Sequence, residues 1–203
     1  MNYFSKYKLI VFDLDNTLIS EKEYLFKAYE DISYFIEKKY FIDRIKIENY
    51  LKNEFIKNGR SKLFDNMFSD FNINDVEMIS ILNILRTVKP RKKISLIENM
   101  KLILEILINN EIPYVIFTNG NVDQQKNKVV NIQWEGLQTE VIYANEINPK
   151  PDTISFSAYL VKNKIQINKH EILMIGDSNV DQLFAEKFGC DFKHVSYFTR
   201  KDI

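Results

Sequence analysis

The sequence contains a single cysteine, Cys190, in 203 residues. One cysteine excludes an intrachain disulfide bond and favours a protein of a reducing compartment. An excess of charge of one sign is also missing, because 28 basic and 28 acidic residues give a formal net charge of zero. The chain therefore lacks the one-sided basic field that is typical of nucleic-acid-binding proteins, and we expect no nucleic-acid partner.

Long apolar runs are absent as well. No stretch approaches the roughly 20 apolar residues that cross a bilayer. The apolar run near the amino terminus ends at Asp13 and is too short for the core of a signal peptide. We therefore expect a cytoplasmic protein that acts without a membrane partner. With 45% hydrophobic and 28% charged residues, the composition is that of an ordinary globular protein.

The most informative stretch is the apolar run 9–12 and the polar residues that follow it, 13–18 (DLDNTL). A continuous apolar run is typical of a strand buried on both faces of a parallel sheet. Ligands bind at the carboxyl ends of such strands. Asp13 and Asp15 could simply form a turn or a helix cap. Because two like charges beside a buried strand are costly without a positive partner, we favour a bound cation.

The patterns that follow this strand form two blocks. In the first block, apolar residues recur at helical spacing in 21–39, 44–57, 63–71 and 75–88. A parallel crossover needs only one helix, so this block predicts a helical subdomain inserted at 19–93. Its second boundary lies near the proline and the basic run at 89–93.

In the second block, strand and helix patterns alternate to the end of the chain. Helices are predicted at 94–110, 122–134, 153–164 and 180–188, and strands at 113–117, 141–144, 171–175 and 192–195. This alternation predicts an α/β fold with a doubly wound parallel sheet, formed by residues 1–18 and 94–203.

Three further polar clusters stand at or near the ends of predicted strands. Thr118 and Asn119 precede a glycine that permits a sharp turn, Lys150 lies between two prolines, and Asp177 and Asp181 follow the strand at 171–175. Each cluster also has a simpler explanation: a turn with a threonine cap, a solvated lysine and a helix cap. Asp177 and Asp181 are four residues apart and therefore face the same side of a helix start. A helix cap explains one of these two aspartates well and both of them less well.

The four clusters together resemble the four motifs of the haloacid dehalogenase-like (HAD) hydrolases, in the family order. Residues 13–18 resemble motif I (DxDxT), 118–120 motif II, 148–152 motif III and 175–181 motif IV (GDSxxD). The helical insertion matches the family only by its position and helical character. The resemblance implies a Rossmann-like core with a C1-type cap that closes over the active site. It also implies a Mg²⁺-dependent phosphatase that acts on a small-molecule phosphate ester, such as a phosphosugar or a nucleoside monophosphate.

The resemblance further implies a catalytic role for each matched residue. Asp13 would attack phosphorus and form an aspartyl phosphate, and Asp15 would act as general acid and then as general base. An acid at Asp15 favours phosphoryl transfer over dehalogenation, because a halide leaves without a proton. The phosphoryl oxygens would be bound by Thr118, by Lys150 and by backbone amides around Leu14 and Asn119.

The resemblance also implies a metal site. Mg²⁺ would be bound by Asp13, the Asp15 carbonyl group and Asp177, with Asp181 acting through a water molecule or orienting Lys150. Mg²⁺ prefers such oxygen ligands. Two other interpretations compete with the phosphatase: a phosphomutase of the same family, and a catalytically silent protein that binds a phosphate ligand.

Within the insertion, three residues are candidates for substrate contacts: Tyr24, Arg60 and Lys62. Arg60 is the most informative of them, because it lies in a basic loop with a glycine, which suits an anion. Solvated side chains are the favoured alternative for all three.

Overall fold

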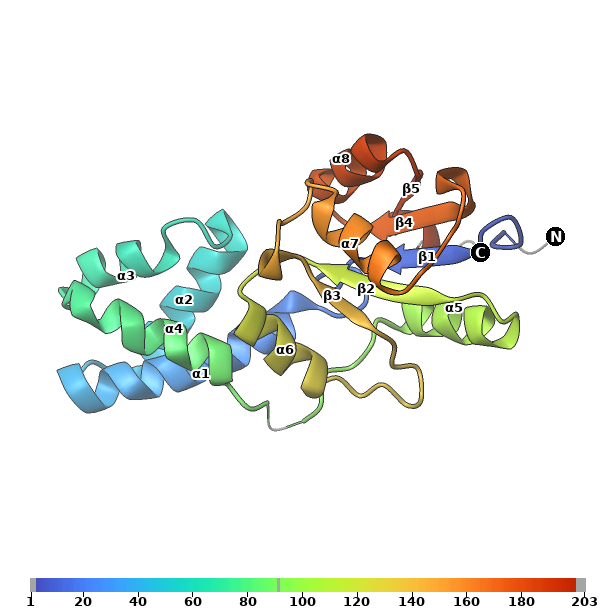
Figure 1. Cartoon of the computed structure of the whole chain (residues 1–203). Coiled ribbons are helices and arrows are strands. Elements are labelled where there is room, and N and C mark those ends of the chain that lie inside the picture. Colours follow the sequence, from blue (N-terminus) through green and yellow to red (C-terminus); the bar gives the residue numbers. More distant parts are fainter. Residues whose placement is uncertain (1–2, 91, 200–203) are drawn as a thin grey trace. The chain divides into compact units, whose positions relative to one another are not determined.

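The computed structural model describes residues 3–90 and 92–199. The chain forms two compact units, Met1–Glu21 together with Lys93–Ile203 and, separately, Lys22–Lys92 (Figure 1). The boundaries predicted from the sequence, 18/19 and 93/94, lie within a few residues of these limits. Of the basic run at 89–93, Arg91 lies outside the described residues.

The larger unit is built on a five-stranded sheet in which all strands are parallel. The strand order is β3-β2-β1-β4-β5, so β1 is central and pairs with β2 and β4. Every residue of β1, β2 and β4 is buried, which explains why their sequences are apolar runs without alternation. The predicted doubly wound parallel sheet is confirmed. The strands are β1 Leu9–Phe12, β2 Tyr114–Thr118, β3 Val141–Tyr143, β4 Ile172–Gly176 and β5 Asp191–His194.

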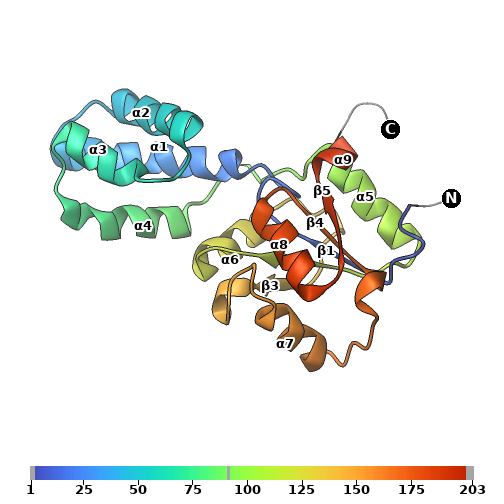
Figure 2. The same ribbon diagram turned by 90° about the horizontal axis from the view of Figure 1, so that it is seen from above.

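Helices cover both faces of this sheet. Apolar residues of β1, β2 and β4 form one core cluster with Phe156 of α7 and Phe184 of α8. In Figure 2, α7 and α8 lie on one face and α5 lies on the other. The helices of this unit are α5 Glu98–Asn109, α6 Val122–Val130, α7 Ile154–Lys162, α8 Asn179–Phe188 and α9 Ser196–Thr199, with short 3-10 turns at Ala144–Glu146 and Lys169–Glu171.

Two predicted helices are shorter than the apolar spacing suggested. The helix expected at 94–110 begins only at Glu98, because Ile94 and Leu96 form bridges with Ile132 and Ile19. The helix expected at 122–134 ends at Val130 for the same reason, since Ile132 is the partner of Ile94. Pairing between segments distant in sequence therefore replaces helical hydrogen bonds at both places.

The smaller unit is entirely helical in its described residues, as its apolar spacing predicts. The ring of Tyr29 lies at its centre, edge-on to the rings of Phe55 and Phe64. The helices are α1 Glu21–Tyr40, α2 Arg44–Asn58, α3 Leu63–Phe71 and α4 Met78–Thr87, with a 3-10 turn at Asp75–Glu77 before α4. Within the described parts of both units, none of the helices has the combination of length and apolar character that a membrane span requires.

Candidate active site

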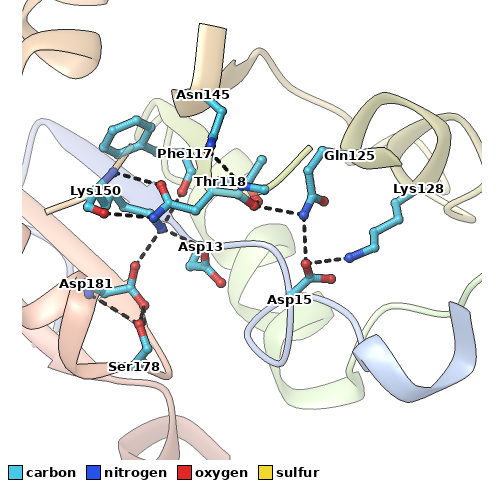
Figure 3. Close-up of polar contacts among 12 residues, drawn as sticks. Asp13, Asp15, Phe117, Thr118, Gln125, Lys128, Asn145, Lys150, Ser178 and Asp181 are labelled. Atoms are coloured by element: carbon cyan, nitrogen blue, oxygen red, sulfur yellow. Dashed lines mark hydrogen bonds and ion pairs between the residues drawn. The ribbon is translucent and has the colours of Figure 1, made fainter. Parts of the chain in front are cut away.

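Asp13 occupies the first position after the central strand. Its N–H donates to the carbonyl oxygen of Ile175 at 2.9 Å, so sheet pairing extends one residue beyond β1 and fixes the backbone there. The side chain is buried, and Oδ1 accepts a hydrogen bond from Nζ of Lys150 at 2.6 Å (Figure 3). Burial raises the pKa of Asp13 to about 7; the ammonium group of Lys150 opposes this rise and the charge of Asp181 adds to it.

Lys150 brings its ammonium group to the same place from a different loop. Its side chain is buried, and Nζ donates to Asp13, to the carbonyl oxygen of Phe117 at 2.7 Å and to Oδ1 of Asp181 at 2.6 Å. These bonds use all three donors of the ammonium group. Burial alone would lower the pKa of Lys150, but the two carboxylates outweigh it and raise the pKa. Lys150 is therefore held as a cation beside Asp13, and the alternative of a solvated lysine is wrong.

The side chain of Asn119 fixes the backbone at Lys150. Its Nδ2 donates to the carbonyl oxygen of Lys150 at 2.9 Å, and its Oδ1 accepts from the N–H of Lys150 at 2.8 Å. The sequence predicted only a backbone amide at Asn119 as a functional group. The carboxamide gives this residue a second task, because it links the loop after β2 to the loop that carries Lys150.

Asp181 both caps a helix and contacts Lys150, using one carboxylate oxygen for each. Oδ2 accepts from the N–H of Ser178 at 3.2 Å and from its hydroxyl group at 2.6 Å, at the start of α8. Oδ1 accepts from Lys150, as described above. A Cβ atom at Gly176 would lie 2.6 Å from the Cβ of Asp181, so the end of β4 requires glycine for Asp181 to reach the site.

Asp13, Asp177 and Asp181 form an acidic group that fits a divalent cation. Each offers one carboxylate oxygen, and these oxygens lie within 4.8 Å of one another. Burial and the charge of Asp181 raise the pKa of Asp177. Among the described residues, Lys150 forms ion pairs with Asp13 and Asp181, so three carboxylates share its positive charge and leave an excess of negative charge that a cation would neutralise. Their hard oxygen atoms are the ligands that Mg²⁺ prefers, so the residues present fit this ion.

Asp15 lies beside this group and is held by helix α6. Its Oδ2 accepts from Nζ of Lys128 at 2.6 Å and from Nε2 of Gln125 at 3.0 Å (Figure 3). Its Oδ1 is buried and has no hydrogen-bond partner among the described residues. Gln125 and Lys128 were not predicted from the sequence. No sequence signal marks them, because polar residues of a short helix usually face solvent, and only the structure shows that both are buried.

Thr118 and Leu14 complete the set of matched residues. Thr118 ends β2, is buried, and its hydroxyl group donates to the carbonyl oxygen of Asn119 at 3.3 Å. Gly120 follows with φ of 124° and donates its N–H to Oδ1 of Asn145 at 2.8 Å. Leu14 lies next to Asp13 with its side chain fully buried. All these residues belong to the larger unit and cluster where β1, β2 and β4 end.

The three candidate residues of the smaller unit have different surroundings. Tyr24 is fully buried and its hydroxyl group donates to the carbonyl oxygen of Leu85 at 2.5 Å. The expectation that Tyr24 is solvated is therefore wrong. Arg60 and Lys62 are exposed in the turn between α2 and α3. A substrate contact stays a prediction for all three.

Comparisons with known proteins bear on this arrangement. The family model described as haloacid dehalogenase-like hydrolase matches residues 10–195. No curated protein shows a significant match. A HAD-superfamily hydrolase of subfamily IA from Geobacter sulfurreducens has a similar structure, with 18% identity over 92% of this chain and 86% of the other and a TM-score of 0.65.

Two further solved structures share the fold. One is a provisionally named HAD-hydrolase, YfnB from Bacillus subtilis, bound to magnesium, with 16% identity, coverage of 92% and 85%, and a TM-score of 0.60. The other is a provisionally named β-phosphoglucomutase from Thermotoga maritima, with 14% identity, coverage of 90% and 82%, and a TM-score of 0.62. The family model covers most of the chain. The chain therefore belongs to the haloacid dehalogenase-like hydrolases.

Proposed function

We propose that the protein is a Mg²⁺-dependent phosphatase that hydrolyses a small-molecule phosphomonoester through an aspartyl phosphate on Asp13. The observation that carries this proposal is the contact between the buried Asp13 carboxylate and the Lys150 ammonium group, 2.6 Å apart, beside the oxygens of Asp177 and Asp181. A carboxylate in such a place is oriented and partly neutralised, as a nucleophile toward a phosphate dianion must be.

Charge is the main obstacle to this reaction. Two like unit charges at 4 Å repel by about 4 kcal/mol at an effective dielectric constant of 20, and a phosphate dianion carries two charges. Asp13, Asp177 and the carbonyl group of Asp15 would hold Mg²⁺, which when bound supplies positive charge that offsets this repulsion. The magnesium-bound relative from B. subtilis supports the choice of ion.

The remaining steps use residues of this chain. Asp13 attacks phosphorus in line with the leaving oxygen, while Lys150 and Thr118 bind the equatorial phosphoryl oxygens. Asp15 gives a proton to the departing alkoxide, which leaves as an alcohol. Asp15 then takes a proton from a water molecule that attacks the aspartyl phosphate, releasing inorganic phosphate and regenerating Asp13.

We assign substrate choice to the helical unit Lys22–Lys92, acting as a cap. Within it, the exposed Arg60 and Lys62 offer positive charge to an anionic substrate, such as a phosphosugar or a nucleoside monophosphate. The relative named as a β-phosphoglucomutase favours one second candidate, a phosphomutase that returns the phosphoryl group to the substrate. Analysis of the products from a sugar phosphate separates the two, since only the phosphatase releases inorganic phosphate.

The proposal is tested by measuring phosphate release from a panel of phosphomonoesters, with Mg²⁺ and with EDTA. We expect the wild type to hydrolyse at least one ester only when Mg²⁺ is present, and Asp13→Asn to be inactive on the same ester. Asp123→Asn is the matched control. Asp123 is exposed on α6, so this variant should retain activity. A wild type that hydrolyses nothing, or an active Asp13→Asn variant, would contradict the proposal.

A further inference from the structure

Helix α6 carries a buried cation whose function the catalytic motifs do not explain. Lys128 is fully buried, and its Nζ lies 2.6 Å from Oδ2 of Asp15 and 3.6 Å from Oε1 of Glu21. A buried ion pair is weak evidence for stability, because apolar residues of similar volume often stabilise a fold as well or better. A buried lysine at this place therefore calls for a functional explanation.

We propose that Lys128, together with Gln125, positions Asp15 for proton transfer by anchoring one of its two carboxylate oxygens. This inference rests on the proposed function, in which Asp15 is the general acid and base. Lys128 and Gln125 are positioning residues, because they act through Asp15 and have no role in binding the phosphoryl group.

The two oxygens of Asp15 have different environments. Oδ2 accepts two hydrogen bonds, from Lys128 at 2.6 Å and from Gln125 at 3.0 Å. Oδ1 is buried without a partner among the described residues. A buried acceptor without a partner is rare and calls for a ligand or a water molecule. Because both hydrogen bonds are made to Oδ2, Oδ1 is the oxygen that carries the transferred proton, and these bonds fix the orientation of the carboxylate group.

Gln125 connects this anchor to the loop after β2. Its Nε2 donates to the carbonyl oxygen of Asn119 at 2.9 Å as well as to Asp15. Nε2 would lie only 2.7 Å from a Cβ atom at Gly120, so the glycine makes room for the Gln125 amide. Asp15 is thereby tied to the same loop whose Asn119 side chain fixes Lys150.

Leaving-group dependence distinguishes positioning from a purely structural role. Benzyl phosphate and 4-nitrophenyl phosphate are similar in size, but benzyl alkoxide needs a proton to leave whereas 4-nitrophenolate does not. The ratio kcat/KM reports steps up to release of the first product, so it isolates proton donation to the leaving group. General acid catalysis contributes about 10²–10⁴-fold.

The experiment compares Lys128→Met with Lys126→Met, which removes an exposed lysine from the same helix. For Lys128→Met we expect kcat/KM to fall about 10- to 100-fold with benzyl phosphate and less than about threefold with 4-nitrophenyl phosphate. Lys126→Met should change neither value. Equal losses on both substrates, or no loss on either, would overturn the positioning role.

Two further variants keep the outcomes distinct. In an Asp15→Asn background, Lys128→Met should cause no further selective loss, because its effect passes through Asp15. If Lys128→Met does not fold, Gln125→Met takes its place and must show the same selective loss, or the proposal fails. If Asp15→Asn itself shows no leaving-group selectivity, the proposed role of Asp15 fails, and the positioning role fails with it.

Discussion

Asp177→Asn should make the metal-free protein slightly more stable and abolish its stabilisation by Mg²⁺. One carboxylate oxygen each of Asp13, Asp177 and Asp181 lies within 4.8 Å of the others, and Lys150 forms ion pairs with Asp13 and Asp181. Two unit charges at that distance repel by about 3.5 kcal/mol at an effective dielectric constant of 20. Because Asp177 is partly exposed, solvent screening reduces the gain from removing its charge to about 1 kcal/mol.

Binding of Mg²⁺ to the wild type should stabilise the fold more than removal of the Asp177 charge does. Mg²⁺ at 100 times its dissociation constant should stabilise the folded wild type by about 2.7 kcal/mol. For a protein of this length, that raises Tm by roughly 5 to 11 °C, whereas Asp177→Asn in EDTA gains about 2 to 4 °C. In the variant, Mg²⁺ should cause almost no shift.

Fluorescence of Trp134 provides the assay for this prediction. Trp134 is the single tryptophan and belongs to the same compact unit as Asp177, so its emission follows unfolding of that unit. Melting curves are recorded in EDTA and at increasing Mg²⁺ concentrations. Asp123→Asn, on the exposed side of α6, should keep the full shift of the wild type. A normal Mg²⁺ shift in Asp177→Asn would refute the assigned metal site.

Three other changes should have measurable effects. Lys150→Met leaves two buried carboxylates without their cation, so it should lower the free energy of unfolding in urea by about 3–5 kcal/mol and abolish activity. The control Lys126→Met should lower it little, and an active Lys150→Met variant would contradict the assignment. Gly176→Ala places a Cβ atom against Asp181; it should cost about 1–3 kcal/mol and lower kcat, and wild-type stability would refute the close packing. On folding, the pKa of Asp13 rises from 3.8 to about 7, so between these pH values the folded state binds more protons than the unfolded state. As the pH rises from 3.8 to about 7, the free energy of unfolding of the metal-free protein should therefore fall by up to about 4 kcal/mol. Asp13→Asn should flatten this slope, and an unchanged slope would be inconsistent with the burial of that charge.

The parallel sheet could be predicted from the sequence because its central strands are buried on both faces. Burial of every residue in β1, β2 and β4 leaves an apolar run that is visible without knowledge of the partners. The residues of the four motifs were brought together by the family resemblance, and the parallel sheet agrees with it, since carboxyl ends of parallel strands meet at one edge of a sheet.

The features that were missed depend on contacts between distant segments. The start of α5 at Glu98 follows from bridges that Ile94 forms with Ile132, and helical spacing alone does not reveal them. Gln125 and Lys128 look like ordinary surface residues of a helix until Asp15 is seen beside them. Residues whose role is to hold another functional side chain carry no motif of their own.

The central claim is that Asp13 becomes phosphorylated during turnover, and a rapid acid quench tests it most directly. The wild type is mixed with ³²P-labelled 4-nitrophenyl phosphate and Mg²⁺ and denatured within a single turnover, and the labelled peptide is identified by mass spectrometry. The account predicts a transient label on the peptide that contains Asp13, and none in Asp13→Asn. A label on another residue, or turnover by the Asp13→Asn variant, would contradict it.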